Sequence, residues 1–149
     1  MKIIEELLQN QVLKVTLTSW IIAQTLKVFL TVRRHKQFDI RWFLGSGGMP
    51  SAHSAGVSAL ATAVGMETGF WTASFAMALI FALVTMFDAQ GVRRAAGRQA
   101  KILNKIVDEA YVSGQVSEER LMELIGHTPV EVFVGAAIGC VMAVAWYKF

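Results

Sequence analysis

The sequence predicts an all-α integral membrane protein: a bundle of about four transmembrane helices with a cytoplasmic amphipathic helical insertion. Three observations support this prediction. The 149-residue chain is 54% apolar and only 17% charged. Its mean hydropathy is +0.48, which is high for a soluble domain. Its apolar residues gather in runs whose lengths match a bilayer. We therefore expect a single membrane-embedded domain over residues 1–149.

Four apolar runs are the predicted spans. The run from Phe70 to Phe87 has no charged residue, and as a helix it rises about 27 Å, close to the roughly 30 Å of a hydrocarbon core. The preceding run is rich in Ala, Gly and Ser, a composition typical of a helix with close neighbours. The last run carries Gly135-x-x-x-Gly139, which permits close helix contact. The approximate spans are 12–32, 51–69, 70–87 and 129–147.

Two polar segments, 33–49 and 88–127, separate these runs. The longer one has apolar residues at helical intervals, which predicts an amphipathic helix. Ser113-Gly114 is expected to end it, and Ser117 to cap a short second helix through Leu124. Four spans place both polar segments on one side of the membrane. Because these segments hold most of the lysines and arginines, we expect them in the cytoplasm, with both termini non-cytoplasmic and the chain in the inner (plasma) membrane.

Composition also limits the classes of function. The chain has one cysteine, Cys140, so it cannot build a disulfide framework or a cysteine-rich zinc site by itself. The net charge of +3 is modest, and the cations cluster beside the predicted spans. We therefore expect the bilayer as a partner, with no nucleic acid, metal or cofactor. Four short spans around a polar pocket are also compatible with a homodimer.

Ionisable residues gather at the predicted helix ends on the cytoplasmic side. Such residues are costly at membrane depth and are candidates for function. Cations and helix N-termini stabilise phosphoryl oxygens, and one histidine can attack phosphorus while another protonates the leaving alcohol. The composition therefore suits a phosphate ester, without a metal. The candidate residues are Lys27, Arg34, Ser51, His53, Asp88, Arg93, Arg94, His127 and Glu131.

The spacing of these residues resembles a known three-part signature. Lys27-x6-Arg34, Pro50-Ser51-Ala52-His53 and an arginine followed later by His127-x3-Glu131 are similar to the motifs of the type 2 phosphatidic acid phosphatase superfamily, which includes vanadium haloperoxidases. The segments GGMPSAHSA, FDAQGVRRAAGRQA and GHTPVEVFVG resemble its compact divergent bacterial and plant branch. The resemblance covers the chain from about Lys27 onward.

The chain also departs from this signature. His35 follows the first-motif arginine in place of a proline. Ala52 replaces a glycine, and Glu131 replaces an aspartate. The insertion 95–126 separates the third-motif arginine from His127, so that arginine is either Arg93 or Arg94.

The resemblance implies a role for each matching residue. Lys27 and Arg34 would hold phosphate oxygens, together with Arg94 or Arg93. Ser51 would donate a hydrogen bond to phosphate.

The same resemblance implies the catalytic roles. His127 would be the nucleophile that forms a phosphohistidine. Glu131 would orient His127, and His53 would be the general acid.

Each candidate also has a structural interpretation. Thr128-Pro129-Val130-Glu131 is a good capping box, so Glu131 is also expected to satisfy backbone donors. Asp88 either caps the following helix or pairs with an arginine that it helps to orient. His53 could be a polar residue satisfied within the bundle. Cations such as Lys27 and Arg34 are common at cytoplasmic helix ends.

The leading hypothesis is a metal-independent lipid phosphatase, a hydrolase of phosphoric monoesters, with its site at the cytoplasmic face. The alternative is a non-catalytic protein that binds or translocates phosphorylated lipids with the same basic pocket. A plain helical scaffold is a third interpretation, in which Lys27, His53 and His127 would tolerate substitution independently.

Overall fold

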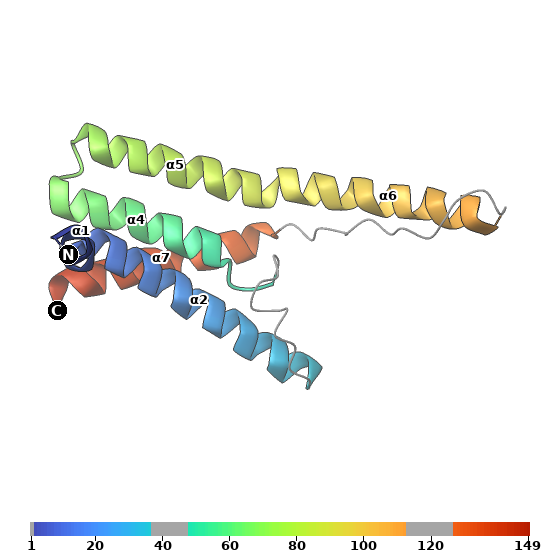
Figure 1. The fold of residues 1–149 in the computed structure, drawn as a ribbon, viewed down its shortest axis with the longest axis horizontal. Helices are drawn as coiled ribbons and strands as arrows, with labels where there is room; N and C mark the ends of the chain where they lie inside the picture. The colour runs from blue at the N-terminus through green and yellow to red at the C-terminus, as the bar shows by residue number, and fades with distance from the viewer. Residues whose placement is uncertain (1, 37–47, 113–126) are drawn as a thin grey trace.

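The computed structural model describes residues 2–36, 48–112 and 127–149, and these residues are helical over most of their length (Figure 1). The prediction of an all-helical chain is confirmed for the described part. The helices are α1 (Lys2–Gln9), α2 (Gln11–His35), α4 (Ala52–Thr68), α5 (Ala73–Gln90), α6 (Val92–Val112) and α7 (Pro129–Lys148).

Helix α4 is the centre of the bundle, and α2, α5 and α7 pack around it (Figure 1). Its buried residues are all Ala, Ser or Gly. Because these side chains are small, neighbouring helices can approach its backbone closely, as the sequence composition predicts. Each of α2, α5 and α7 contacts α4 more extensively than it contacts the other two.

The contact between α4 and α7 depends on two glycines. A Cβ atom built on Gly135 would collide with the carbonyl oxygen of Ser51, and one built on Gly139 would collide with the carbonyl oxygen of Ala55. The two helices therefore touch backbone to backbone. This is the close approach that the Gly-x-x-x-Gly spacing predicts.

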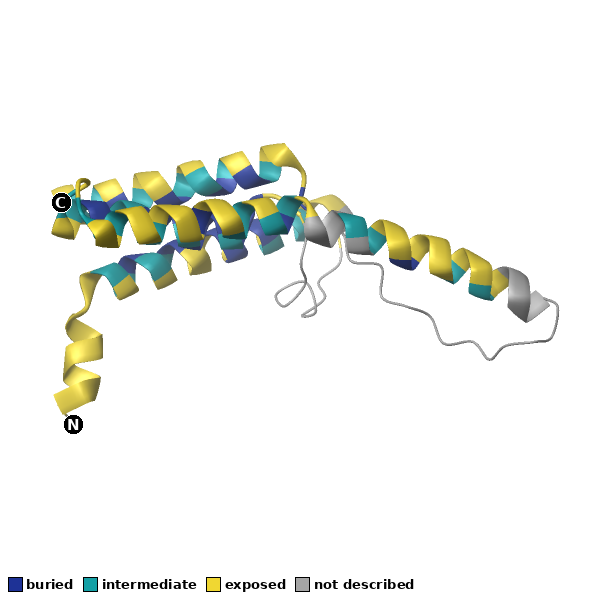
Figure 2. Cartoon of the chain, turned by 90° about the horizontal axis from the view of Figure 1, so that it is seen from above, coloured by how far each residue is buried: buried dark blue, intermediate teal, exposed yellow. Residues whose placement is uncertain are grey.

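Within the described part of the chain, three helices are long and apolar enough to cross a bilayer: Gln11–Arg34, Ala73–Gln90 and Pro129–Lys148. They turn large apolar side chains outward, where Figure 2 shows mostly exposed surface. Phe81 and Phe133 are 56% and 74% exposed, which is costly in water and favourable in hydrocarbon. Helix α4, with 17 residues, is not among these three, so the fourth predicted span stays a prediction.

The helix starts have local causes that the sequence contains. Thr72 begins α5 by accepting a hydrogen bond from the Phe75 N–H at 3.2 Å, and Asn10 begins α2 by accepting one from the Leu13 N–H at 2.9 Å. These side chains satisfy backbone donors that a helix leaves unpaired. The short α1, which precedes Asn10, was not predicted.

Helix α6 follows α5 almost in line and extends beyond the bundle (Figure 1). It lies within the predicted polar segment 88–127 and ends at Val112, directly before the Ser113-Gly114 pair. The predicted second helix, 117–124, lies outside the described residues, as does Arg120. The side chains of Ile102 and Ile106 are more than half exposed. The assignment of this segment as a cytoplasmic amphipathic insertion stays a prediction.

Candidate functional site

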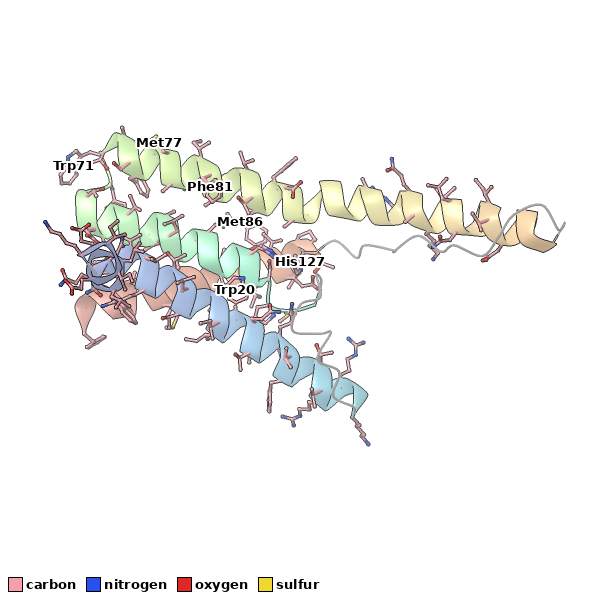
Figure 3. The ribbon with its side chains drawn as sticks, viewed as in Figure 1. Trp20, Trp71, Met77, Phe81, Met86 and His127 are labelled. Atoms are coloured by element: carbon pink, nitrogen blue, oxygen red, sulfur yellow. The ribbon has the colours of Figure 1, made fainter. Side chains whose placement is uncertain are left out.

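The C-terminal ends of α2 and α5 and the N-terminal ends of α4 and α7 lie at the bundle end remote from both termini (Figure 1). The Ser51 N–H at the start of α4 donates to the carbonyl oxygen of Glu131 in α7 at 3.0 Å. The His127 N–H, directly before α7, donates to the carbonyl oxygen of Ala89 in α5 at 3.1 Å. Figure 3 shows His127 at this end, with Trp71 at the other. These backbone hydrogen bonds join α4, α5 and α7 at the candidate site.

His127 and Glu131 form the best-defined pair of the site. The Nδ1 atom of His127 lies 3.0 Å from Oε2 of Glu131, and the two side chains are 3% and 19% exposed. Because a carboxylate only accepts hydrogen bonds, Nδ1 is the nitrogen that donates to Glu131, and Nε2 is the nitrogen left for a ligand. The pair therefore orients an imidazole with a nucleophilic nitrogen.

The same carboxylate also caps α7. Oε2 of Glu131 accepts the Thr128 N–H at 3.1 Å, and the Thr128 hydroxyl oxygen accepts the Glu131 N–H at 3.4 Å. This is the predicted capping box, with Pro129 in the first turn. The structural and the orienting interpretations of Glu131 are therefore compatible, because one oxygen atom makes both contacts.

His53 lies in the first turn of α4 and is half-buried. The centroids of the His53 and His127 rings are 6.5 Å apart, and the ring planes are tilted by 58°. Two imidazoles at this separation can act on one small group held between them, one as nucleophile and the other as acid. The fold thus brings together two histidines from opposite halves of the chain.

Ser51 begins α4 and is fully buried. Its hydroxyl oxygen accepts the Ser54 hydroxyl at 3.0 Å and the Ser54 N–H at 3.3 Å. Neither bond uses the proton of Ser51, which can therefore be donated to another acceptor. Sequence reasoning missed Ser54. The signal was the Ser-x-x-Ser spacing at a helix start, where the side chain at the third helical position lies beside the cap.

Lys27 is only 6% exposed, on the side of α2 that faces the bundle. A Cβ atom built on Gly48 would lie 3.4 Å from Cγ of Lys27 and 3.5 Å from Cδ, so the backbone before Ser51 runs along the lysine stem. Gly48 has a φ of 84°, a left-handed conformation that glycine adopts without steric cost. Burial of an ammonium group at membrane depth is costly, which marks Lys27 as a functional candidate.

The other predicted residues stand further from this cluster or are less fully described. Arg34 lies exposed in the last turn of α2, at the end that projects from the bundle in Figure 1. Asp88 is half-buried near the end of α5, next to Ala89. The backbone of Arg93 and Arg94 lies in the first turn of α6, but their side chains lie outside the described part of the structure, so Arg93 and Arg94 remain alternatives.

The chemistry available at this end is that of anion binding. Helices α4 and α7 both begin here, and a helix N-terminus carries partial positive charge. Lys27 adds a buried cation. Among the residues that the structure describes, no group of three or more His, Cys, Asp or Glu side chains could hold a metal ion.

The fold and this cluster together define a class: a small helical membrane protein with paired histidines at one end of its bundle. The sequence comparisons agree. The family model described as "Divergent PAP2 family" matches residues 8–142, and the chain belongs to this family. It is 40% identical over 155 residues to the uncharacterized membrane protein YuiD of Bacillus subtilis (strain 168), with 97% of this chain and 98% of that protein covered. No solved structure matches the chain.

Proposed function

We propose that this protein is a phosphatase of membrane lipid phosphates that works through a phosphohistidine. The observation that carries the proposal is the buried His127, whose Nδ1 is 3.0 Å from Oε2 of Glu131. A buried imidazole oriented by a carboxylate is the arrangement of an activated nucleophile. Membership of a divergent phosphatase family supports the same chemistry.

The reaction would proceed in two steps. Nε2 of His127 attacks phosphorus, the bond from phosphorus to the lipid oxygen breaks, and protonated His53 gives its proton to the leaving alcohol. Water then attacks the phosphohistidine, His53 takes a proton from this water, and inorganic phosphate leaves as the bond to Nε2 breaks. The histidines return to their starting states, so each turnover consumes one water molecule.

The remaining residues would stabilise the phosphoryl oxygens. Lys27 and the Ser51 hydroxyl lie on the segments that flank the histidines, and Arg34 with Arg93 or Arg94 would add guanidinium groups. Charge that develops on the transferred phosphoryl group is stabilised by donors already in position. Asp88 would orient one of these arginines.

We further propose that the site faces the cytoplasm, with four spans and both termini on the opposite side of the plasma membrane. The distribution of lysine and arginine along the sequence supports this orientation. Both ends of the described chain lie at the bundle end opposite the site (Figure 1). A cytoplasmic site would favour lipids made on that leaflet, such as phosphatidate or phosphatidylglycerophosphate.

The proposal is tested by phosphate release from purified protein in detergent, with a panel of phospholipids and polyprenyl phosphates as substrates. We expect release that survives EDTA, stops with vanadate and is lost in His127→Ala. Vanadate tests the site because it imitates the phosphoryl group in transfer. His35→Ala, the same substitution at the end of α2, is the matched control and should retain activity. Lipid binding without release by the folded protein would favour the non-catalytic alternative.

A further inference from the structure

A groove of about 390 Å³ runs along α4 on the side that lies between α2 and α5. Its floor is formed by Gly56, Val57 and Leu60 of α4, and Trp20 of α2 and Phe81 of α5 form opposite walls. Figure 3 labels Trp20 and Phe81 on the helices to either side of α4. The lining is almost entirely apolar.

Gly56 sets the depth of this groove. A Cβ atom built on Gly56 would lie 3.6 Å from Cβ and 3.7 Å from Cδ1 of Trp20, in ordinary van der Waals contact. A single methyl group is therefore tolerated there. A longer side chain at this position would extend into the space between Trp20 and the rest of the lining.

The groove opens sideways, at the depth of the apolar helices. Trp20 is 37% exposed and Phe81 is 56% exposed, although both line the groove. They belong to two of the helices that are apolar enough to cross a bilayer. In a membrane, the medium outside this opening is lipid hydrocarbon rather than water.

The groove is continuous with the candidate site. His53 lines one end of it, and the ring of His53 is 6.5 Å from that of His127. Leu60 lies toward the other end of the groove, about 10 Å from His53 along α4 at the rise of an α-helix. A ligand that lies in the groove therefore has one end beside the histidines.

We propose that this groove holds one hydrocarbon chain of the lipid whose phosphorylated headgroup binds beside His53 and His127. This inference rests on the proposed function for the headgroup and adds a binding site for the tail. A single alkyl chain suits the groove because its lining is apolar, its opening lies at the depth of the apolar helices and His53 is among the residues that line it. Because the chain moves from lipid hydrocarbon into an apolar groove, van der Waals packing stabilises it there rather than the hydrophobic effect.

Photolabelling tests the groove independently of catalysis. The protein is reconstituted in vesicles that contain a phosphatidic acid with a diazirine in one acyl chain, and the labelled residues are found by mass spectrometry. We expect label on Val57 and Leu60 of α4, which are partly shielded from bulk lipid. In Gly56→Leu, this label should fall to the level found at the lipid-exposed positions of the other helices, because the new side chain fills the space beside Trp20 and excludes the acyl chain.

Ala137→Leu is the matched control, because it adds the same side chain to the exposed face of α7. It should leave the α4 label unchanged. Gly56→Ala should retain most of the label on α4. The melting temperature of each variant shows whether that variant folds. If Gly56→Leu does not fold, Trp20→Ala, which removes one wall, should lower the α4 label in its place.

Label confined to the outer faces of α2, α5 and α7 would overturn the proposal that the groove binds an acyl chain. Equal label on α4 in the wild-type protein and in Gly56→Leu would also overturn it. The assay also separates this proposal from the phosphatase. Label on α4 without phosphate release would support the groove and refute the phosphatase. Phosphate release without label on α4 would support the phosphatase and refute the binding of an acyl chain in the groove.

Discussion

The two ends of the α4–α7 pair are both joined by hydrogen bonds, but only one end buries its polar groups. At the candidate site, Ser51 and His127 are 0% and 2% exposed. At the opposite end, the Tyr147 hydroxyl donates to Oε2 of Glu67 at 2.6 Å, and this carboxylate is exposed.

The difference separates function from structural stability. An exposed hydrogen bond can join two helices without any cost of burying polar groups. Buried polar groups lose their contact with water, and this loss must be offset by interactions within the protein. The burial of a lysine, a serine and a histidine at one end therefore supports the proposal of a ligand site there.

The largest expected effect comes from a comparison in which one glutamate at each end of the α4–α7 pair is replaced by glutamine. Glu131→Gln keeps an oxygen that can cap α7 but removes the negative charge that orients His127. We expect phosphate release to fall by up to about 10⁴-fold, the loss in kcat found when the carboxylate that orients a catalytic histidine is replaced by an amide. Glu67→Gln should keep activity near wild type. Steady-state kinetics of the two variants measure the rate of phosphate release. Equal losses of activity in the two variants would contradict the proposal that only the buried end carries the site.

A second pair of substitutions divides stability from activity within the α4–α7 contact. Gly135→Ala places a Cβ against the carbonyl oxygen of Ser51, and Gly139→Ala places one against that of Ala55. Each should destabilise the bundle by about 1–3 kcal/mol through overpacking. Only Gly135→Ala should also lower kcat, since Ser51 belongs to the site. Thermal unfolding and kinetics on the same preparations test this prediction. An equal loss of kcat in Gly135→Ala and Gly139→Ala would argue against a local site.

The buried lysine provides a third test. Lys27→Met removes an ammonium group and keeps a chain of similar length, so the release of phosphate should fall about tenfold in kcat/KM through one lost charged hydrogen bond. The melting temperature of the same variant reports on the structural role of Lys27. Lys14→Met, near the opposite end of α2, should change neither quantity. A fall in melting temperature with unchanged activity would show that Lys27 is structural.

The smallest effect is expected at the far end. Tyr147→Phe removes the hydrogen bond to Glu67 and should cost about 0.5–1.5 kcal/mol of stability, the usual net value of one hydrogen bond. Activity should not change. Chemical denaturation in mild detergent measures the first quantity, and a loss of turnover would show that the two ends are coupled through α4 and α7.

The sequence determined those features whose causes are local. Apolar runs predict long helices because the pattern within each run is enough to show that its surface prefers hydrocarbon. Thr128 and Glu131 predict a capping box because both partners lie within one helical turn, and Gly135 and Gly139 predict a close contact because they lie on one helix face.

Only the tertiary structure decided which distant residues meet. The distance between the His53 and His127 rings, the burial of Lys27 against Gly48 and the groove between Trp20 and Phe81 each depend on how separate helices pack. No spacing within one segment contains that information. Side-chain size along α4 permits the close packing, but the angles and registers between helices arise from all contacts of the bundle together.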